Sequence, residues 1–504
     1  MRHLGMCDLQ KVRKRRVEFT LQDLQAFAAW SRDFNPLHLS EKYSRTTSFG
    51  EPIVHGILGV IRALFFLPPP SRHRIQALDI QFLGPLFTGI SYSAEVEEDL
   101  HEVRLQDGEK CLLRIRLQYA DTGLTHPWKP QTAHLKVPKV VTEPKVWNLG
   151  QLSSGMTFKG VWSADWGSSA SIFSAAGDIW STLTEQDERV LNALLWASFF
   201  VGMESPGRDA LFSKVCLKIL DTNAGKLEQD FESLSYEATL DSIDSRFGLL
   251  RFSSLLPFAE IQLEAFLRKT VSPFEPAKLL SILPSSKQLE GKVALVIGAS
   301  RGFGAGLSAC LASQGCTVWA SYHKSETEMQ NLVKACAGFP GKIIPIQGDA
   351  SLASWCREAK NSVQRDSGKL DFLFCNATTS LQRTAGFVPT NVALVDQPLS
   401  HFGRLLDESG GICVLTSSTA VSESDSDQPH YVAAKRAQEA RVESALLEYP
   451  RIRALVLRPD RMETDLTNSP LGHIGARSPL EVAVSVVSRL LDPMLDRLEV
   501  RENF

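Results

Sequence analysis

From Gly291 onward, β-rich runs alternate with helical segments, and this alternation constrains the fold more than any other feature. The predicted strands are KVALVIG, CTVWASY, KIIPIQGDA, LDFLFCNA, GICVLTSS and IRALVLRP. FGAGLSACLASQG, after the first of them, has the pattern of a helix. Strands that alternate with helices form a parallel sheet with helices on both faces. We therefore expect residues 286–504 to form a doubly wound α/β domain.

Two proline-containing stretches, 126–149 and 272–290, divide the remainder of the chain. At 504 residues the chain is too long for one hydrophobic core, because cores stop growing near ~250–300 residues. The parts before Gly291 lack the strand–helix alternation. Each shows one buried helix followed by amphipathic strand candidates, which is typical of an α+β unit. The expected domains are 1–140, 141–285 and 286–504.

The composition narrows the classes of function. The net charge of −3 gives no field that would attract nucleic acid. The longest apolar stretches fall short of the ~20 residues that a membrane span needs. The nine cysteines include no C-x-x-C pair, so we expect no metal site and no disulfide framework. These features favour a cytoplasmic enzyme that acts on small molecules.

A glycine-rich turn follows the first strand of the C-terminal domain and opens a helix. A turn of this kind offers backbone N–H groups and the positive end of a helix to a pyrophosphate. Glycine permits the close approach of the backbone. The predicted nucleotide-binding residues of the turn are Gly298, Ser300, Arg301, Gly302, Phe303 and Gly304.

Four polar residues of the same domain have a spacing that indicates chemistry. Tyr431 and Lys435 are four residues apart in a helical segment, so both side chains lie on one face. Ser418 ends a strand thirteen residues before Tyr431. Asn376 lies at the carboxyl end of another strand, where doubly wound sheets bind ligands.

Together these residues resemble the short-chain dehydrogenase/reductase family over roughly residues 290–504. The resemblance implies a Rossmann fold in which Tyr431 protonates the carbonyl oxygen as hydride arrives. Lys435 would lower the pKa of the tyrosine and hold the nicotinamide ribose. Ser418 would hydrogen-bond the substrate oxygen, and Asn391 would hold a proton-relay water. A phenol with a pKa near ~10 does need a neighbouring cation to act near neutral pH.

The second strand of this domain bears on the choice of cofactor. NAD-dependent enzymes usually end it with an acidic residue that accepts from the ribose 2′-OH. Here it ends in Ser321-Tyr322-His323-Lys324. Arg301 and Lys324 could both pair with a 2′-phosphate, so NADP(H) is favoured over NAD(H). Asp349 matches the family's adenine contact, and Asn376 completes the predicted cofactor site.

The N-terminal region carries a second set of chemical groups. Asp33 and His38 are separated by a proline-held turn and could converge on one water molecule. Seventeen residues after His38, His55 and Gly56 begin an apolar helix. The free N–H groups of that helix, including that of Gly56, could stabilise a thioester oxygen that gains charge as an enolate forms.

This region resembles the MaoC-like, R-specific enoyl-thioester hydratases and dehydratases of the hot-dog fold over about residues 15–135. The resemblance rests on the D-x-N-P-x-H pattern from Asp33 to His38. It implies that Asp33 and His38 are the acid/base pair and that Asn35 is a positioning group. Arg32 departs from the family, which usually has glycine there.

Residues 159–270 repeat the outline of the first domain faintly. No histidine occurs between His134 and His323, so this segment cannot perform the chemistry of Asp33 and His38. We expect a degenerate, non-catalytic second hot-dog that helps to shape an acyl-chain tunnel; a spacer domain is the alternative. The expected fold class is an α+β double hot-dog followed by an α/β Rossmann domain.

The two resemblances together predict a bifunctional acyl-thioester enzyme. Tyr431, Lys435 and Ser418 would reduce a 3-ketoacyl thioester with NADPH, and Asp33 and His38 would interconvert the 3-hydroxyacyl and enoyl thioesters. Fatty-acid-like or polyketide-like biosynthesis is favoured over β-oxidation. A reductase whose hot-dog half only binds an acyl or carrier group, or a thioesterase, remains an alternative. Coenzyme A or acyl carrier protein would carry the substrate, and a homodimer or larger homo-oligomer is expected.

Overall fold

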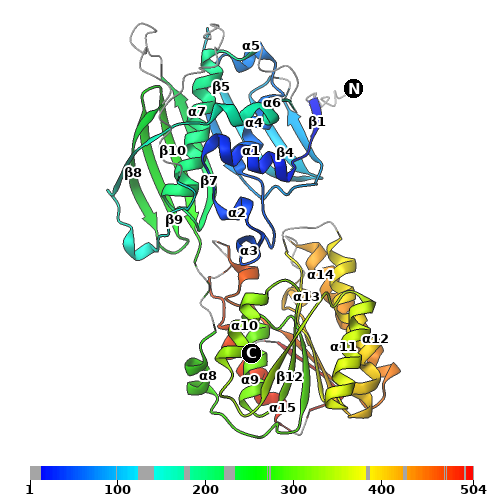
Figure 1. Ribbon diagram of the computed structural model, residues 1–504. Coiled ribbons are helices and arrows are strands. Elements are labelled where there is room, and N and C mark those ends of the chain that lie inside the picture. Colours follow the sequence, from blue (N-terminus) through cyan, green and yellow to red (C-terminus); the bar gives the residue numbers. More distant parts are fainter. Residues whose placement is uncertain are drawn as a thin grey trace, which may run out of the picture. The chain divides into compact units, whose positions relative to one another are not determined.

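The computed structural model describes residues 13–97, 99–122, 141–174, 182–220, 233–269, 271, 274–381, 386–423, 428–469, 472, 474–492 and 495–502. The chain divides into two compact units (Figure 1). The first comprises Met1–Arg45 and Glu51–Thr270, and the second comprises Thr46–Gly50 and Val271–Phe504. The division of residues 1–285 into two domains stays a prediction.

The described residues of the first unit form one ten-stranded antiparallel sheet, ordered β1-β3-β4-β5-β2-β7-β10-β9-β8-β6. Its strands are β1 (Arg13–Val17), β2 (Ile75–Phe82), β3 (Tyr92–Val96), β4 (Glu102–Asp107), β5 (Lys110–Tyr119), β6 (Thr157–Trp162), β7 (Ala210–Ile219), β8 (Leu234–Asp244), β9 (Leu249–Leu256) and β10 (Ala259–Leu267).

The sheet consists of two halves with the same strand order. Read from its outer edge, each half places its first, third, fourth, fifth and second strand in succession. The halves meet where β2 pairs with β7, from Ala77 opposite Lys218 to Gln81 opposite Lys214. The sheet therefore continues without a break from one half to the other.

The described residues of the first unit also form α-helices. They are α1 (Leu21–Ser31), α2 (Pro36–Leu39), α3 (Glu41–Ser44), α4 (Gly56–Leu64), α5 (Pro69–Arg72), α6 (Ala170–Ser174) and α7 (Glu185–Phe199). The central helix of the first half, α4, contacts β4, β5 and α7, and its counterpart α7 contacts β2, β7 and β10. Both are buried on nearly all sides, and the buried residues of α7 include polar ones such as Asp187 and Ser198.

The described strands of the second unit form a seven-stranded parallel sheet, ordered β13-β12-β11-β14-β15-β16-β17. This order confirms the expected doubly wound, Rossmann-like fold. The strands are β11 (Val293–Ile297), β12 (Thr317–Tyr322), β13 (Lys342–Gln347), β14 (Phe372–Cys375), β15 (Ile412–Thr416), β16 (Arg453–Arg458) and β17 (Leu498–Glu502).

Helices lie on both faces of the parallel sheet, with a hydrophobic core on each side. They are α8 (Pro276–Ile282), α9 (Gly302–Ser313), α10 (Glu326–Ala335), α11 (Ala353–Ser367), α12 (Phe387–Glu408), α13 (Ala420–Glu423), α14 (Pro429–Glu448) and α15 (Pro479–Leu490). In Figure 1, α9, α10 and α15 lie on one side of β12, and α11, α12 and α14 lie on the other. Because the strands are parallel, their carboxyl ends share one edge of the sheet.

Candidate functional sites

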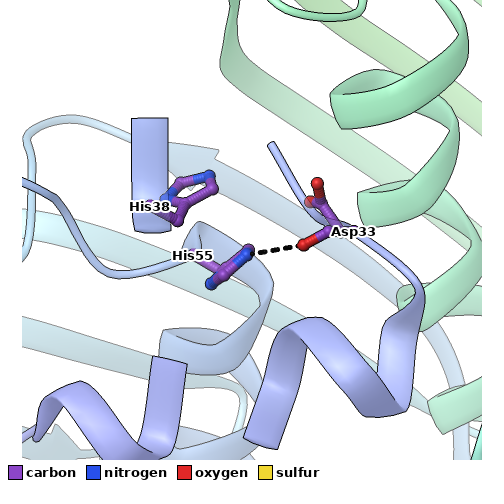
Figure 2. Close-up of side chains that lie close together, drawn as sticks. All are labelled: Asp33, His38 and His55. Atoms are coloured by element: carbon purple, nitrogen blue, oxygen red, sulfur yellow. Dashed lines mark hydrogen bonds between the residues drawn. The ribbon is translucent and has the colours of Figure 1, made fainter. Parts of the chain in front are cut away.

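Asp33, His38 and His55 lie together in the first unit (Figure 2). Asp33 follows α1, His38 is on the short helix α2, and His55 is the N-cap residue of α4. Each offers a carboxylate or imidazole atom, and these atoms all lie within 4.8 Å of one another. The predicted convergence of Asp33 and His38 at the start of an apolar helix is therefore present in the structure.

Hydrogen bonds fix the orientation of the two imidazoles. Nδ1 of His38 lies 2.8 Å from the carbonyl oxygen of Ile53 and donates to it, which leaves Nε2 as a proton acceptor. Nε2 of His55 donates to the backbone carbonyl of Asp33 at 3.1 Å. The two rings stack, with centroids 3.8 Å apart. His55 therefore ties the backbone of Asp33 to the start of α4 and packs its ring against His38.

Burial shifts the pKa values of Asp33 and His38 in opposite directions. Burial raises the pKa of Asp33 to about 7, although hydrogen bonds from Ser198 and the Asn35 amide favour the carboxylate. Burial also lowers the pKa of His38 to about 4. The pKa of His55 is well below its usual value, for the same reason and because His38 is adjacent. Two groups whose pKa values are displaced in this way suit acid/base chemistry.

Two residues that contact Asp33 come from the second half and were not foreseen from the sequence. The Ser198 hydroxyl, on α7, donates to Oδ2 of Asp33 at 2.7 Å. Gly202, in the π-helical turn Phe200–Glu204 after α7, has no side chain next to the same carboxylate. A Cβ at position 202 would lie 2.2 Å from Oδ1. The second half thus supplies part of the Asp33 environment.

Asn35 connects the same two halves. Its Nδ2 donates to the carbonyl oxygens of Gly202 at 2.9 Å and Gly207 at 3.0 Å. Its Oδ1 accepts from the Leu37 N–H at 2.9 Å and caps α2. Asn35 therefore holds the backbone around Asp33 and His38.

Arg32 and Gly56 both lie at positions that suit glycine. Arg32 ends α1 with a left-handed φ of 64°, a conformation that glycine adopts without strain, and its guanidinium pairs with Asp165 at 3.5 Å. Gly56 is the first residue of α4, so its N–H has no partner within the helix. A Cβ at Gly56 would lie 2.6 Å from the ring of Phe82.

A second cluster lies at the carboxyl edge of the parallel sheet, where Ser418 follows β15 and Tyr431 and Lys435 are on α14. Nζ of Lys435 is 5.7 Å from the Tyr431 ring centroid and donates to the Thr416 carbonyl at 2.7 Å. Burial raises the pKa of Tyr431, and a hydrogen bond with Ser418 opposes that increase. Burial lowers the pKa of Lys435 to about 8. The structure therefore brings the three predicted residues together.

Asn391 is buried on α12 and its side chain is fully hydrogen-bonded. Oδ1 accepts from the Thr378 hydroxyl at 2.8 Å and the Thr379 N–H at 3.2 Å. Nδ2 donates to the Thr379 hydroxyl and the Phe387 carbonyl. The Asn391 carbonyl accepts from Gln438 Nε2 at 2.6 Å. These bonds give Asn391 a role in joining α12, α14 and the segment after β14, while its role in a proton relay stays a prediction.

The glycine-rich turn lies between β11 and α9 and has the close packing that a pyrophosphate cradle requires. Gly298 has a φ of +79°, and Gly304 approaches the Gly298 carbonyl so closely that a Cβ would lie 2.0 Å from it. Nδ2 of Asn376, after β14, donates to the same carbonyl at 3.0 Å. Asn376 thus holds the turn against the neighbouring strand end.

The other predicted cofactor residues differ in their surroundings. Arg301 is the N-cap of α9, and its Nη1 pairs with Asp465 at 2.9 Å. Oδ1 of Asp349, after β13, accepts from the backbone and hydroxyl of Ser351. The Phe303 side chain is 4% exposed and belongs to the core, so only its backbone can face a nucleotide. The remaining members of the set are Ser300 and Gly302 in the turn and Lys324 just beyond β12.

Comparison with known families agrees with this division into two kinds of site. Residues 292–470 match the family model "short chain dehydrogenase", and residues 9–110 match "MaoC like domain". The chain therefore carries a MaoC-like domain followed by a short-chain dehydrogenase domain. The MaoC match implies a hot-dog fold for the N-terminal region.

Individual relatives match short stretches of the chain. An (R)-specific enoyl-CoA hydratase of Aeromonas caviae is 40% identical over 82 residues, which are 16% of this chain and 61% of the relative. A 3-oxoacyl-acyl-carrier-protein reductase of Thermotoga maritima is 34% identical over 90 residues, 18% of this chain and 36% of the relative. An uncharacterized oxidoreductase of Methylorubrum extorquens is 38% identical over 90 residues, and the match covers 36% of its length. The chain thus spans only about a third to three fifths of these relatives.

Solved structures also resemble the chain in part. An alcohol dehydrogenase from the archaeon Thermococcus sibiricus, complexed with 5-hydroxy-NADP, has 24% identity and a TM-score of 0.39, covering 42% of this chain and 95% of that chain. A short chain dehydrogenase from Burkholderia cenocepacia in complex with NADP has 25% identity and a TM-score of 0.38, covering 43% and 98%. Within the described part of the chain, no helix has the length and apolar character to cross a membrane.

Proposed function

We propose that this protein is a bifunctional acyl-thioester enzyme. Its short-chain dehydrogenase domain reduces a 3-ketoacyl thioester, and its MaoC-like domain interconverts the 3-hydroxyacyl product and the enoyl thioester. The observation that carries the proposal is the presence of two complete sets of reacting groups, Asp33 with His38 and Tyr431 with Lys435 and Ser418. The product of one site is a substrate of the other, which favours the pairing in fatty-acid-like or polyketide-like synthesis.

At the MaoC-like site, Asp33 and His38 share one proton during the reaction. In dehydration, neutral His38 removes the proton on the α-carbon through Nε2, and protonated Asp33 gives its proton to the departing hydroxyl group. Water and an enoyl thioester leave the site, and the proton then passes from His38 back to Asp33. Hydration is the reverse. The Gly56 N–H, at the start of α4, is placed to stabilise the negative charge on the thioester oxygen.

At the reductase site, the phenol of Tyr431 donates its proton to the carbonyl oxygen, and Ser418 holds that oxygen by a hydrogen bond. The nicotinamide cofactor supplies the hydride when it is bound. Lys435 faces the Tyr431 ring and would hold the nicotinamide ribose. Gly298 and Gly304 allow the turn to pack closely, since a Cβ at Gly298 would lie 2.9 Å from Ala377 Cα and one at Gly304 would lie 2.0 Å from the Gly298 carbonyl oxygen. The backbone N–H groups at the start of α9 would hold the pyrophosphate.

NADPH is the cofactor we propose for the reduction. The segment after β12 places Lys324, and no carboxylate, where NAD-dependent enzymes usually hold the ribose 2′-OH. Arg301, which also pairs with Asp465, and Lys324 are the two candidates for the charge-assisted contact with a 2′-phosphate.

The first unit is proposed to be a double hot-dog whose second half supports the first. The repeated strand order and the paired central helices support this assignment. The second half contributes Ser198, Gly202 and the carbonyls that bind Asn35. These contacts support a role of the second half in forming the MaoC-like site rather than as a spacer.

One assay tests the MaoC-like function without the reductase. Purified protein is incubated with a crotonyl or 3-hydroxybutyryl thioester and no nucleotide, and enoyl absorbance is followed. Wild type should interconvert the two, and Asp33→Asn should not. If wild type leaves both thioesters unchanged, the N-terminal half is a binding module; release of free thiol would identify a thioesterase.

A further inference from the structure

Glu439 is a buried acid on α14 that the proposed mechanism does not use. It lies one helical turn after Lys435 and is 9% exposed. Its carboxylate accepts hydrogen bonds from the Ser417 hydroxyl at 2.5 Å and from Nε and Nη2 of Arg458 at 3.0 and 2.8 Å. A buried carboxylate with three such bonds is firmly oriented.

These contacts join Glu439 to the segment that carries the reductase chemistry. The Thr416 carbonyl accepts from Lys435, the next residue, Ser417, donates to Glu439, and Ser418 follows directly. The Ser417 N–H also donates to the Leu457 carbonyl at 2.7 Å. Thr416 and Ser417 are thus bonded to residues of α14, and the next residue, Ser418, belongs to the proposed active site.

Arg458 extends the network to the last strand. Its Nη1 donates to Glu502 on β17 at 2.8 Å and to the Ser422 hydroxyl at 3.1 Å. The guanidinium thereby has a carboxylate on each side. It can stay paired with Glu502 when Glu439 is changed, which makes substitution at Glu439 structurally tolerable.

Several groups contribute to the electrostatic surroundings of Lys435. On its own helix these are the Tyr431 phenol and Glu439, and on β14 it is the Cys375 thiol. The Thr416 carbonyl on β15 accepts from Lys435. Arg458 on β16 is paired with Glu439.

α12 also packs against α14. Its acid Asp396 is paired with Arg441. Burial lowers the pKa of Lys435 to about 8, while Glu439 and Cys375 oppose that decrease.

We propose that Glu439 is a positioning residue of the reductase site, which holds the Thr416–Ser418 segment against α14 and supplies a fixed negative charge one turn from Lys435. The proposal rests on the assignment of Tyr431, Lys435 and Ser418 as the reductase residues. Its two parts are separable, because the hydrogen bond to Ser417 can survive a change that removes the charge.

Two substitutions in the full-length protein test the charge. Glu439→Gln keeps an acceptor for Ser417 and removes the negative charge, so the pKa of Lys435 should fall by roughly 0.5–1 unit. Arg458→Gln removes a positive charge from the same network and should raise it. Both are measured as the pH dependence of NADPH affinity by nucleotide fluorescence, and as the pH profile of kcat/KM with an acetoacetyl thioester. Opposite shifts are expected, with kcat about 10-fold lower in Glu439→Gln.

Glu448→Gln is the matched control, since Glu448 is an exposed acid at the end of the same helix; its profiles should coincide with those of wild type. A merely structural role for Glu439 would lower thermal stability and leave the pH profiles where they are, and that result would overturn the proposal. If wild type binds NADPH but reduces no ketoacyl thioester, the proposed function fails. The affinity profiles still decide the role of Glu439 in that case.

Discussion

The Ser198 hydroxyl donates a 2.7 Å hydrogen bond to the Asp33 carboxylate, although the two residues are 165 positions apart in the chain. Ser198 lies on α7 of the second half, and Asp33 follows α1 of the first. The proposed acid/base site is thus assembled from both halves of the ten-stranded sheet.

Replacing Ser198 with alanine should impair the hydratase reaction. The bond favours the Asp33 carboxylate, so its loss should raise the pKa of Asp33 further and leave Oδ2 without its donor. We expect kcat to fall about 10-fold and the alkaline limit of activity to move to higher pH. Ser254→Ala is the control, because Ser254 is a buried serine of the second half that bonds the Glu237 carbonyl away from the site. Equal activity of Ser198→Ala and wild type would contradict the role given to Ser198.

The hydratase reaction should have a bell-shaped pH dependence. Both directions require one proton on the pair of Asp33 and His38. The pair holds one proton between the pKa of His38, about 4, and that of Asp33, about 7. Activity should therefore decline below the first value as His38 becomes protonated and above the second as Asp33 loses its proton. A rate that continues to rise above pH 8 would show that Asp33 acts as a simple base.

Gly202→Ala should disturb Asp33 directly. The new Cβ would lie 2.2 Å from Oδ1, so the carboxylate or the turn after α7 must move. Overpacking of this kind typically lowers the free energy of unfolding by about 1–3 kcal/mol, and hydratase activity should be lost. Urea unfolding and the enoyl-absorbance assay measure the two effects. Gly338→Ala serves as the control because open space surrounds that position.

Tyr431→Phe should abolish the reductase and spare the hydratase. Removal of a positioned proton donor typically costs about 10²–10⁴-fold in rate, measured as NADPH oxidation with an acetoacetyl thioester. Tyr449→Phe, in the same domain, should behave like wild type. Loss of hydratase activity in Tyr431→Phe would mean that the two sites do not function independently.

The cofactor preference should depend on Lys324. Wild type is expected to oxidise NADPH faster than NADH at equal concentration. Lys324→Ala should raise the KM for NADPH about 10-fold, the typical value of one lost charge-assisted bond, and leave NADH almost unaffected. The exposed Lys334 on α10 offers a matched control. Equal rates of wild type with the two cofactors would refute the assignment.

The sequence was sufficient to predict much of the second unit. β11, β14 and β15 are continuous apolar runs that are buried throughout, so they could be recognised without knowledge of their neighbours. β12, β13 and β16 were recognised from the same strand–helix alternation. The glycine turn and the spacing of Tyr431 and Lys435 placed the proposed site on these elements. Phe303 was predicted as a residue of the nucleotide-binding turn, and its side chain lies in the core; a motif position does not by itself distinguish a backbone contact from a side-chain contact.

The first unit was less predictable for a physical reason. The pattern from Asp33 to His38 is local, and it identified the reacting groups. The residues that surround Asp33 come from a segment with no recognisable motif, and a serine within an apolar helix carries no signal of its partner. The backbone conformation of Arg32 was also not predictable. Its left-handed φ arises because it ends α1, and an arginine in the sequence does not indicate such a conformation.

The pairing of β2 with β7 limits how this protein can be dissected for study. A fragment that ends after β5 would retain Asp33 and His38 but would expose β2 as a bare edge strand, with unpaired N–H and C=O groups over the stretch that β7 covers. Edges of this kind promote aggregation. The fragment would also lack α7, leaving the apolar helix α4 without one of its neighbours. Expression trials should therefore keep residues 13–269 together.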